Sequence, residues 1–452
     1  MINFNSLCTT IFLFVSFIIN AQELEKKVDE YLYPLVSSGD FYGTVLFAKD
    51  GKIELVKGYG FANIEHRIKN TSQTIYHIAS VNKPITSVGV MYLHQNGSLD
   101  INDPISKHLP DYPNGKKITI KNLLSQTSGI PSYNRFSDYR DYSKRENYLK
   151  EVVDWFKDKD LLFKPGSKYG YSNSNFVLLA YIIENVSGLS YQEFMEKNIF
   201  NPLKMEHTKP FEYDEIVPNR AEGYDPANTT FALKKTGFYN NSIKTGSGAL
   251  YSTVGDLLKL DQALYTEDIL NEVTKKLMFT AIDKNEYGLG WGIWKRFDKN
   301  KHDHDGASPG SVAYFSRYPD DRVTIIFLGN INTGAFNPMK YDLAAIYFNE
   351  EYKIPGSKKY ITLDENSLKQ YEGRFEFESG NFFDLKVKEG NLRFLWRGRG
   401  ELGYLLSPLG DGKFYMRARG DQIEFKKKGS ATEVYYTERS GTARLKKVIK
   451  DL

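Results

Sequence analysis

Apolar positions follow two different periods between residues 23 and 351. Residues 85–92 carry apolar side chains at helical spacing, and residues 177–183 form a second apolar segment of the same kind. Residues 312–318 and 323–328 are apolar runs separated by a Pro-Asp-Asp turn, which predicts two adjacent strands. Helices mixed with antiparallel strands predict an α+β architecture.

The pattern changes after an Ile-Pro-Gly segment at residues 354–356. Residues 383–387 alternate between apolar and polar side chains, a glycine turn follows, and residues 392–396 alternate again. Short alternating strands with glycine-rich turns are typical of small all-β domains. We therefore expect residues 358–452 to form a small barrel-like all-β domain.

An apolar run near the start of the sequence has the length of a secretion signal. Residues 11–19 are apolar but too few to cross a bilayer, and the small Ala21 precedes a charged stretch. We expect residues 1–21 to be a cleaved signal peptide, which places the chain in the periplasm or outside the cell. No later segment is apolar for long enough to span a membrane. Cleavage would remove Cys8, the only cysteine, and with it any disulfide or cysteine nucleophile.

The charge of the chain argues against a nucleic-acid partner. The 60 basic and 56 acidic side chains are spread along the sequence and leave a net charge of +4. Proteins that bind nucleic acids usually concentrate basic side chains on one face, and the sequence contains no such block. We therefore expect no nucleic-acid partner.

Ser80 and Lys83 form the only Ser-x-x-Lys sequence of the chain. The apolar spacing that follows predicts a helix, and Pro84 is compatible only with its first turn. Residues three apart share one helix face, so the Lys83 amine can reach the Ser80 hydroxyl. A serine needs a base to become a good nucleophile, and lysine is such a base when burial lowers its pKa. From these residues alone, the alternative is a serine helix cap beside a surface lysine.

Tyr171 and Asn173 lie between a Pro-Gly loop signal and the second apolar helix. This context predicts a phenol fixed in a cleft and an Asn173 amide free to hold a substrate carbonyl. A phenol with a pKa of about 10 acts as a base near neutrality only if a cation such as Lys83 stabilises the phenolate. The alternative is a buried tyrosine with a satisfied hydroxyl.

A third candidate segment is His304-Asp305-Gly306-Ala307, just before the two predicted strands. Gly306 would let a substrate backbone approach the strand edge. Amide groups there, with the Ser80 amide, could form an oxyanion hole. His304 would add positive charge or a hydrogen bond near the leaving group.

His302 and His304 also leave a metal site as an alternative, because alternate residues point to one side of a strand. A usable site needs three or more ligands, and the sequence offers no further partner. We predict neither a metal nor a cofactor.

These three segments, in this order, resemble the serine β-lactamase-like family. It includes class C β-lactamases, low-molecular-weight penicillin-binding proteins, D-stereospecific aminopeptidases and related esterases, and it uses Ser-x-x-Lys, Tyr-x-Asn and Lys-or-His-x-Gly. Further segments resemble family sequences around these motifs, namely residues 118–130, 163–166, 248–253 and 304–310. The resemblance covers the chain from about Val45 to Leu328.

The resemblance implies the β-lactamase/DD-peptidase fold for residues 22–352, with an antiparallel sheet flanked by helices and an all-helical region. It implies that Ser80 attacks a carbonyl to give an acyl-enzyme, which water then hydrolyses. Lys83 and Tyr171 would share the base and acid roles. The implied catalytic set is Ser80, Lys83, Tyr171 and His304, and the implied substrate-binding set is Asn173, Asp305, Gly306 and Ala307.

Three positions depart from the family pattern. Lys244-Thr245-Gly246 matches the third motif literally but leads into a predicted helix, so we interpret it as a chance match. Asp305 replaces the usual Thr or Ser, and its carboxylate would repel a substrate carboxylate or the acid of a penicillin. Gln126 stands where many relatives have His, and we interpret it as structural.

Three functions remain open at this point. The first is an exported serine hydrolase acting on D-amino-acid peptides, amides or esters. The second is a DD-carboxypeptidase or β-lactamase acting on peptidoglycan or penicillins. The third is an inactive relative that binds cell-wall peptides.

Overall fold

The computed structural model describes residues 4–211, 215–226, 233–282, 286–356, 358–397, 403–429, 431–438 and 441–448. Its contacts divide the chain into two compact units. The first, here called the mixed unit, comprises residues 43–222 and 237–330. The second, here called the β unit, comprises residues 1–42, 223–236 and 331–452.

A six-stranded antiparallel sheet forms the centre of the mixed unit, with the strand order β10-β11-β12-β13-β1-β2. Its strands are β1 (Gly43–Lys49), β2 (Lys52–Tyr59), β10 (Gly292–Arg296), β11 (Lys299–Ser308), β12 (Ser311–Tyr318) and β13 (Val323–Gly329). The two predicted apolar strands are β12 and β13, and both are buried along their whole length. Burial on both faces explains why their apolar residues run on without alternation.

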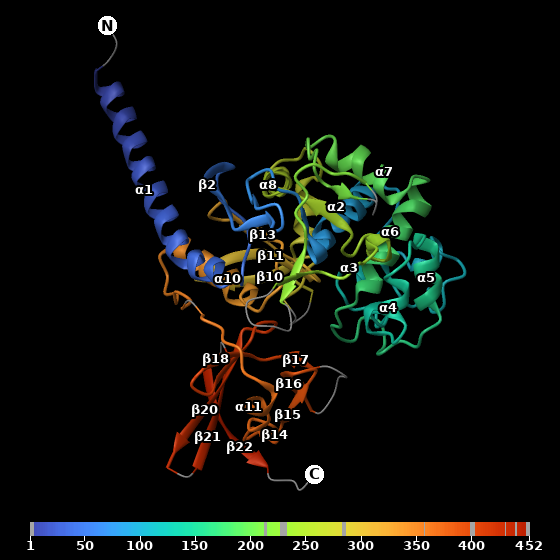
Figure 1. Cartoon of the computed structure of the whole chain (residues 1–452). Helices are drawn as coiled ribbons and strands as arrows, with labels where there is room; N and C mark the ends of the chain where they lie inside the picture. Colours follow the sequence, from blue (N-terminus) through green and yellow to red (C-terminus); the bar gives the residue numbers. More distant parts are fainter. Residues whose placement is uncertain are drawn as a thin grey trace. The chain divides into compact units, whose positions relative to one another are not determined.

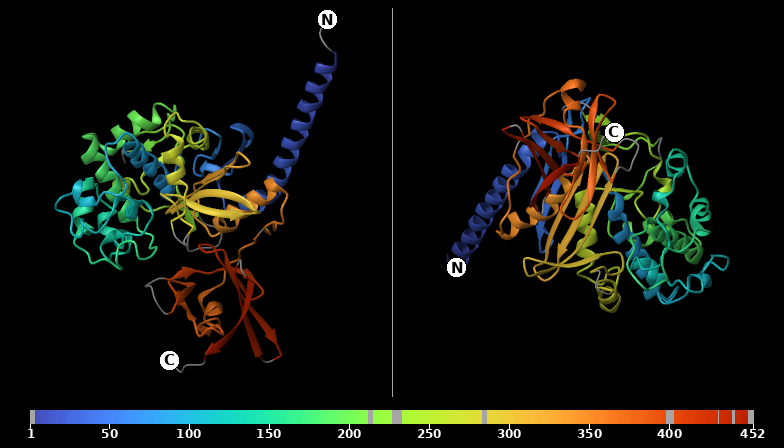
Figure 2. Two further views of the ribbon diagram at one scale, coloured as in Figure 1. Left: turned by 180° about the vertical axis from the view of Figure 1, so that it is seen from behind. Right: turned by 90° about the horizontal axis from the view of Figure 1, so that it is seen from below.

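Helices gather at one side of this sheet (Figures 1 and 2). They are α2 (Asn82–Gln95), α3 (Ile120–Leu124), α4 (Tyr139–Tyr142), α5 (Leu149–Lys157), α6 (Asn173–Ser187), α7 (Tyr191–Met195), α8 (Val254–Ala263) and α9 (Glu272–Met278). The two predicted apolar helices are α2 and α6, whose side chains share one core with those of the sheet. The α+β prediction is therefore confirmed.

Short elements connect these parts of the mixed unit. One small sheet pairs β3 (Phe61–Asn63) with β4 (Ile68–Lys69), and another has the order β5-β9-β6. The strands of the latter are β5 (Tyr76–His77), β6 (Lys209–Pro210) and β9 (Leu250–Ser252). The single turns of 3-10 or π helix are η1 (Ala79–Val81), η2 (Ile105–Lys107), η3 (Tyr133–Arg135), η4 (Glu196–Phe200) and η5 (Asn241–Lys244).

The β unit contains a nine-stranded antiparallel sheet in the order β17-β16-β15-β14-β22-β21-β20-β19-β18. The strands are β14 (Gly373–Glu376), β15 (Phe382–Lys388), β16 (Asn391–Trp396), β17 (Tyr404–Leu405), β18 (Ser407–Gly410), β19 (Lys413–Met416), β20 (Asp421–Lys428), β21 (Ala431–Glu438) and β22 (Gly441–Val448). Its two edge strands, β17 and β18, are separated in the chain only by Leu406, so the two edges must lie close together. The sheet is therefore nearly closed around an aromatic core, as the barrel-like prediction required.

The contacts also group three helices and a small hairpin with this sheet. The helices are α1 (Phe4–Ser37), α10 (Phe336–Phe348) and α11 (Glu365–Lys369), and the hairpin consists of β7 (Tyr224–Pro226) and β8 (Leu233–Lys235). This division differs from the sequence boundaries at residues 22–352 and 358–452, which stay a prediction. In the described part of the chain, no helix has both the length and the apolar character needed to cross a bilayer.

Asp40, just after α1, is a buried acid of the β unit with several hydrogen-bond partners. It is 2% exposed. Its carboxylate accepts hydrogen bonds from Arg417 Nε at 3.0 Å, Tyr360 Oη at 3.2 Å and Ser38 Oγ at 2.8 Å. The backbone oxygen of Asp40 accepts a further bond from Thr333 Oγ1 at 2.6 Å. The cluster thus joins the end of α1 to the strand region that carries Arg417.

Asp40→Asn is expected to lower the free energy of unfolding by about 3 kcal/mol, because it leaves the buried Arg417 guanidinium without its counter-charge. Denaturant unfolding followed by circular dichroism measures this change. The matched control is Asp50→Asn, which removes an exposed ion pair with Arg322 and should cost less than about 1 kcal/mol. Equal losses in the two variants would contradict this account.

Candidate active site

Ser80 lies in the η1 turn that leads directly into α2. The preceding residue, Ala79, has a φ of 44°, which is an unusual backbone conformation for a residue with a Cβ. Strain of this kind persists only where the surrounding structure enforces it, and it concentrates at functional sites. Ser80 therefore stands at a sharply turned position at the start of a buried helix.

The Lys83 amine lies within hydrogen-bonding distance of the Ser80 hydroxyl. Lys83 is completely buried, and its Nζ lies 2.9 Å from Ser80 Oγ and 2.7 Å from the Ser247 carbonyl oxygen. Burial lowers the pKa of Lys83 well below its usual range, although Asp305 opposes the shift. A neutral amine can donate to the Ser247 carbonyl and accept the Ser80 proton. The predicted pairing of Ser80 with Lys83 is therefore present in the structure.

Tyr171 approaches the same serine from the loop before α6. Its ring lies 4.9 Å from Lys83 Nζ. Burial raises the pKa of the Tyr171 phenol, with smaller contributions from Asp305 and Tyr169, while a hydrogen bond with Ser80 opposes the rise. Tyr171 therefore stays protonated near neutrality. The protonated phenol can donate a proton, and the joint assignment of the base and acid roles to Lys83 and Tyr171 stays a prediction.

Gln126 fixes the loop that carries Tyr171. Its Oε1 accepts the Ser172 amide at 2.9 Å and Asn175 Nδ2 at 2.7 Å. Its carbonyl oxygen accepts the Gly170 amide at 2.8 Å. Gln126 thus holds the residues on both sides of Tyr171, in agreement with its interpretation as structural.

His304, on β11, lies behind Tyr171. The two ring centroids are 6.3 Å apart. Burial and the nearby Lys83 lower the pKa of His304 to about 4, which favours the neutral ring near pH 7, and the expected role of His304 near the leaving group stays a prediction. The neutral ring donates from Nδ1 to the Asp305 carbonyl oxygen at 2.7 Å and accepts at Nε2 from Tyr287 Oη at 3.2 Å. Its contribution is a hydrogen bond.

Gly306 lies where β11 meets the backbone at Ser80, and the expected approach of a substrate backbone there stays a prediction. A Cβ at this position would lie 2.6 Å from the Ile78 oxygen and 2.8 Å from the Ser80 nitrogen. The space beside Gly306 is therefore filled by the chain's own backbone at the nucleophile. The glycine allows β11 to lie against the backbone at Ser80, and the next residue of the strand, Ala307, lines the same cavity as Ser80.

Ser80 opens into a cavity of about 220 Å³. Its lining combines three tyrosines with amide, hydroxyl and lysine side chains from six segments: Ala79, Ser80, Tyr133, Asn134, Tyr139, Asn173, Tyr239, Lys244, Ser247, Gly248, Ala307, Ser308 and Pro309. The predicted Asn173 and Ala307 are among these residues. Lys83 and Tyr171 contact Ser80 but are not among the residues that line this cavity.

Lys244 lines the cavity at Ser80 although its sequence only matches the third motif by chance. Lys244 belongs to η5 and not to a strand beside the nucleophile, so it does not occupy the third-motif position. Its side chain nevertheless lines the cavity and donates to Ser308 Oγ at 2.9 Å. Burial lowers its pKa to about 8. No local pattern predicts this contact, because the two residues are 64 positions apart.

Asp305 is half-buried on β11. Its charge acts on Lys83, on Tyr171 and on the buried His304. Asp305 is therefore close enough to Lys83, Tyr171 and His304 to influence their pKa values. The expected repulsion of substrate carboxylates stays a prediction.

The two histidines of the metal alternative have separate surroundings. The His302 ring stacks on Phe279 with centroids 4.3 Å apart, whereas His304 faces Tyr171 and Tyr287. Across the residues that the structure describes, no group of three or more His, Cys, Asp or Glu side chains could hold a metal ion.

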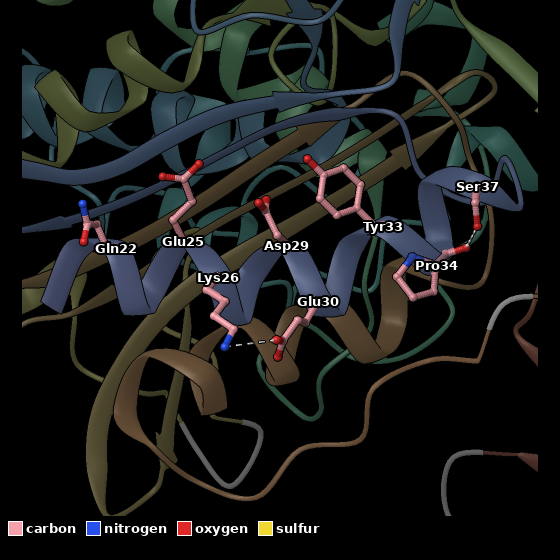
Figure 3. A pocket seen from close by; sticks show the side chains of 8 residues that line it. All are labelled: Gln22, Glu25, Lys26, Asp29, Glu30, Tyr33, Pro34 and Ser37. Atoms are coloured by element: carbon pink, nitrogen blue, oxygen red, sulfur yellow. Dashed lines mark hydrogen bonds and ion pairs between the residues drawn. The ribbon is translucent and has the colours of Figure 1, made fainter. Parts of the chain in front are cut away.

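A second hollow lies along α1, in the β unit (Figure 3). Its lining comes from this one helix: Gln22, Glu25, Lys26, Asp29, Glu30, Tyr33, Pro34 and Ser37. Lys26 and Glu30 form an exposed ion pair there at 3.9 Å. None of these side chains is fully buried, so the hollow offers no activated group.

Known proteins have sequences similar to this chain over most of its length. The Beta-lactamase family model matches residues 26–347. Penicillin-binding protein 4* of Bacillus subtilis is 30% identical over 430 residues, which cover 89% of this chain and 94% of that protein. The chain belongs to the serine β-lactamase family and is a serine hydrolase.

Solved structures agree with this assignment. The octameric penicillin-binding protein homologue from Pyrococcus abyssi is 26% identical, with a TM-score of 0.65, over 94% of this chain and 99% of that one. A D-stereospecific amidohydrolase from Streptomyces sp. is 25% identical, with a TM-score of 0.58, over 67% of this chain and 93% of that one. The predicted family and fold are confirmed.

Gly306→Ala is expected to slow acylation of Ser80 by more than about tenfold, because the added methyl group pushes β11 away from the Ser80 amide. The rate of labelling by a fluorophosphonate measures this effect. Gly255→Ala is the matched control, since its Cβ would meet only Thr253 Oγ1 at 3.8 Å. Equal labelling rates for both variants would show that the close approach at Gly306 is unimportant.

Proposed function

We propose that this chain is an exported hydrolase that forms an acyl-enzyme on Ser80 with D-amino-acid peptides, amides or esters. The observation that carries the proposal is the completely buried Lys83 amine, 2.9 Å from Ser80 Oγ. Ser80, Lys83, Tyr171 and His304 form the proposed catalytic set. Asn173, Gly306 and Ala307 help to bind the substrate or to place its binding groups.

The first step is attack of Ser80 Oγ on the substrate carbonyl carbon, with transfer of the hydroxyl proton to the neutral Lys83 amine. The carbonyl oxygen becomes an oxyanion, which the amides of Ser80 and Ala307 stabilise. Asn173, on the cavity wall, holds a substrate carbonyl. This geometry favours Lys83 over Tyr171 as the first base.

The second step releases the leaving group. Tyr171 donates its phenolic proton to the leaving oxygen or nitrogen, and the Lys83 ammonium returns a proton to Tyr171. His304 supports this transfer through its hydrogen bond with Tyr287. Water then attacks the carbonyl carbon of the acyl-enzyme. The same groups take a proton from this water and deliver one to Ser80 Oγ as it leaves, which regenerates the serine hydroxyl. The net reaction converts the ester or amide substrate and one water into a carboxylic acid and an alcohol or amine.

The preference for D-amino-acid substrates is supported by the 25% identical D-stereospecific amidohydrolase. Export is supported by the apolar residues 11–19 and by the similarity to penicillin-binding proteins. Cleavage after Ala21 would leave the half of α1 that carries the buried Val28, Tyr31 and Leu32. A cell-wall fragment is therefore an accessible substrate.

A penicillin-directed activity is the second candidate, because the 30% identical relative is a penicillin-binding protein. The carboxylate of Asp305 argues against it, since a penicillin also carries a negative charge. A pure binding role is the third candidate. A pure binding role would not require a buried lysine amine beside Ser80.

A fluorophosphonate is expected to label Ser80, whereas a penicillin labels it slowly. Mass spectrometry of chain recovered from the periplasm or medium detects both adducts, and N-terminal sequencing tests cleavage after Ala21. Ser80→Ala should remove every adduct. Asp305→Thr should raise the penicillin labelling rate by about tenfold, because it removes a like charge from the site.

Fast penicillin labelling that Asp305→Thr leaves unchanged would favour the second candidate. Folded chain that reacts with neither probe would favour the binding role.

The rate of ester hydrolysis should fall with decreasing pH as Lys83 becomes protonated. The Lys83 pKa lies well below 10.5, so the amine is neutral above its shifted pKa and inactive below it. Measured with D-alanine methyl ester, kcat/KM should fall about tenfold per pH unit on this acidic limb, and the L-enantiomer should react more slowly.

Lys83→Arg, which is charged at every accessible pH, should lower kcat by about 10⁴-fold. The control is Lys121→Arg, an exposed residue of α3. A Lys83→Arg variant with substantial activity would exclude Lys83 as the base.

A further inference from the structure

Lys244 is a buried lysine on the cavity wall that the reaction at Ser80 does not use. It is 9% exposed. Its Nζ donates to Ser308 Oγ at 2.9 Å and to Asn241 Oδ1 at 3.1 Å. The Tyr239 ring lies 5.5 Å away. These neighbours hold the ammonium in place, but none of them is an anion.

The charge of Lys244 lacks compensation from the protein. In the part of the chain that the structure describes, no carboxylate lies within 4.0 Å of its Nζ. Lys301 is a useful comparison, because it is 4% exposed and pairs with Asp303 at 2.8 Å. A buried charge is costly unless it is paired. An ammonium group has three N–H donors. Among the described residues, Lys244 Nζ has two acceptors, Asn241 Oδ1 and Ser308 Oγ.

The position of Lys244 relates this charge to the substrate. Lys244 and Ser80 line the same cavity. Ser308, which accepts the Lys244 hydrogen bond, is adjacent to Ala307, whose amide we place at the oxyanion. The third donor of Lys244 is therefore close to the place where a bound carbonyl reacts.

Asp305 does not neutralise Lys244. Its charge shifts the pKa values of Lys83, Tyr171 and His304, whereas the pKa of Lys244 is shifted by burial alone. The site thus has an acidic side at the proton carriers and a cationic side at Lys244. A substrate carboxylate is disfavoured at the first and favoured at the second.

We propose that Lys244, oriented by Ser308 and Asn241, binds a carboxylate of the substrate and makes the enzyme prefer esters or amides that carry an acidic group. This inference rests on the proposed acyl-enzyme at Ser80. A monoanionic carboxylate fits one lysine among neutral hydroxyl and amide groups. A phosphate would call for further cations, and the cavity lining contains no arginine.

The test compares two chromogenic esters of matched length, the para-nitrophenyl monoester of succinic acid and its methyl-capped neutral counterpart. The measured quantity is the ratio of their kcat/KM values at pH 7, where the ammonium form of Lys244 dominates. The ratio cancels any loss that affects both esters equally. We expect wild-type chain to prefer the anionic ester.

Lys244→Met should lower this ratio by about tenfold or more, because a charge-assisted hydrogen bond is lost. Lys244→Arg should retain most of the preference. Lys150→Met, which removes an exposed lysine of α5, controls for the change in net charge and should leave the ratio unchanged.

A ratio that is the same in wild type and Lys244→Met, with hydrolysis that still requires Ser80, would overturn this inference and leave the proposed function intact. A preference for the neutral ester in the wild type would overturn it as well. Failure of both esters, together with the absence of any Ser80 adduct, would instead reject the proposed function and this inference with it.

Discussion

The burial of the Lys83 amine is the constraint on which the proposed chemistry depends. Lys83 Nζ lies between Ser80 Oγ and the Ser247 carbonyl oxygen, with no access to water. In water this amine would be an ammonium, unable to accept a proton. Burial lowers the pKa of this amine well below its usual range, and the energy needed for it comes from the packing of the core around α2. The proposed mechanism therefore depends on the stability of the mixed unit.

Distant segments meet around Ser80 and Lys83, and a glycine, a glutamine and a histidine support their meeting. Gly306 allows β11 to touch the backbone at Ser80. Gln126 holds the loop of Tyr171 from both sides. His77, on β5, lies 2.7 Å from the Gly248 oxygen and 3.0 Å from Ser311 Oγ, and so links the segment after Lys244 to the start of β12. These supports lie outside the reacting groups, yet they set the geometry of the site.

The sequence predicts those features that depend on local order. The helical spacing of residues 85–92 identifies α2, and the apolar runs around the Pro-Asp-Asp turn identify β12 and β13. Ser80, in the η1 turn, and Lys83, in the first turn of α2, are three residues apart along a continuous helical segment, so their contact follows from helix geometry. Contacts between distant segments do not follow in this way. Lys244 reaches Ser308 only because η5 and β11 are brought together by the tertiary fold. The protonation state of His304 is hidden for a similar reason, since it depends on burial that no motif reports.

The strand order of the β unit has a consequence for how the chain acquires its structure during synthesis. β14 pairs with β15 on one side and with β22 on the other. The latter partner is the last strand of the sheet in chain order, separated from β14 by seven other strands. A ribosome must therefore complete residues 441–448 before β14 can find its second neighbour. Until then the growing chain holds two incomplete hairpin arrays with open edges, and loss of this final segment would leave them permanently unjoined.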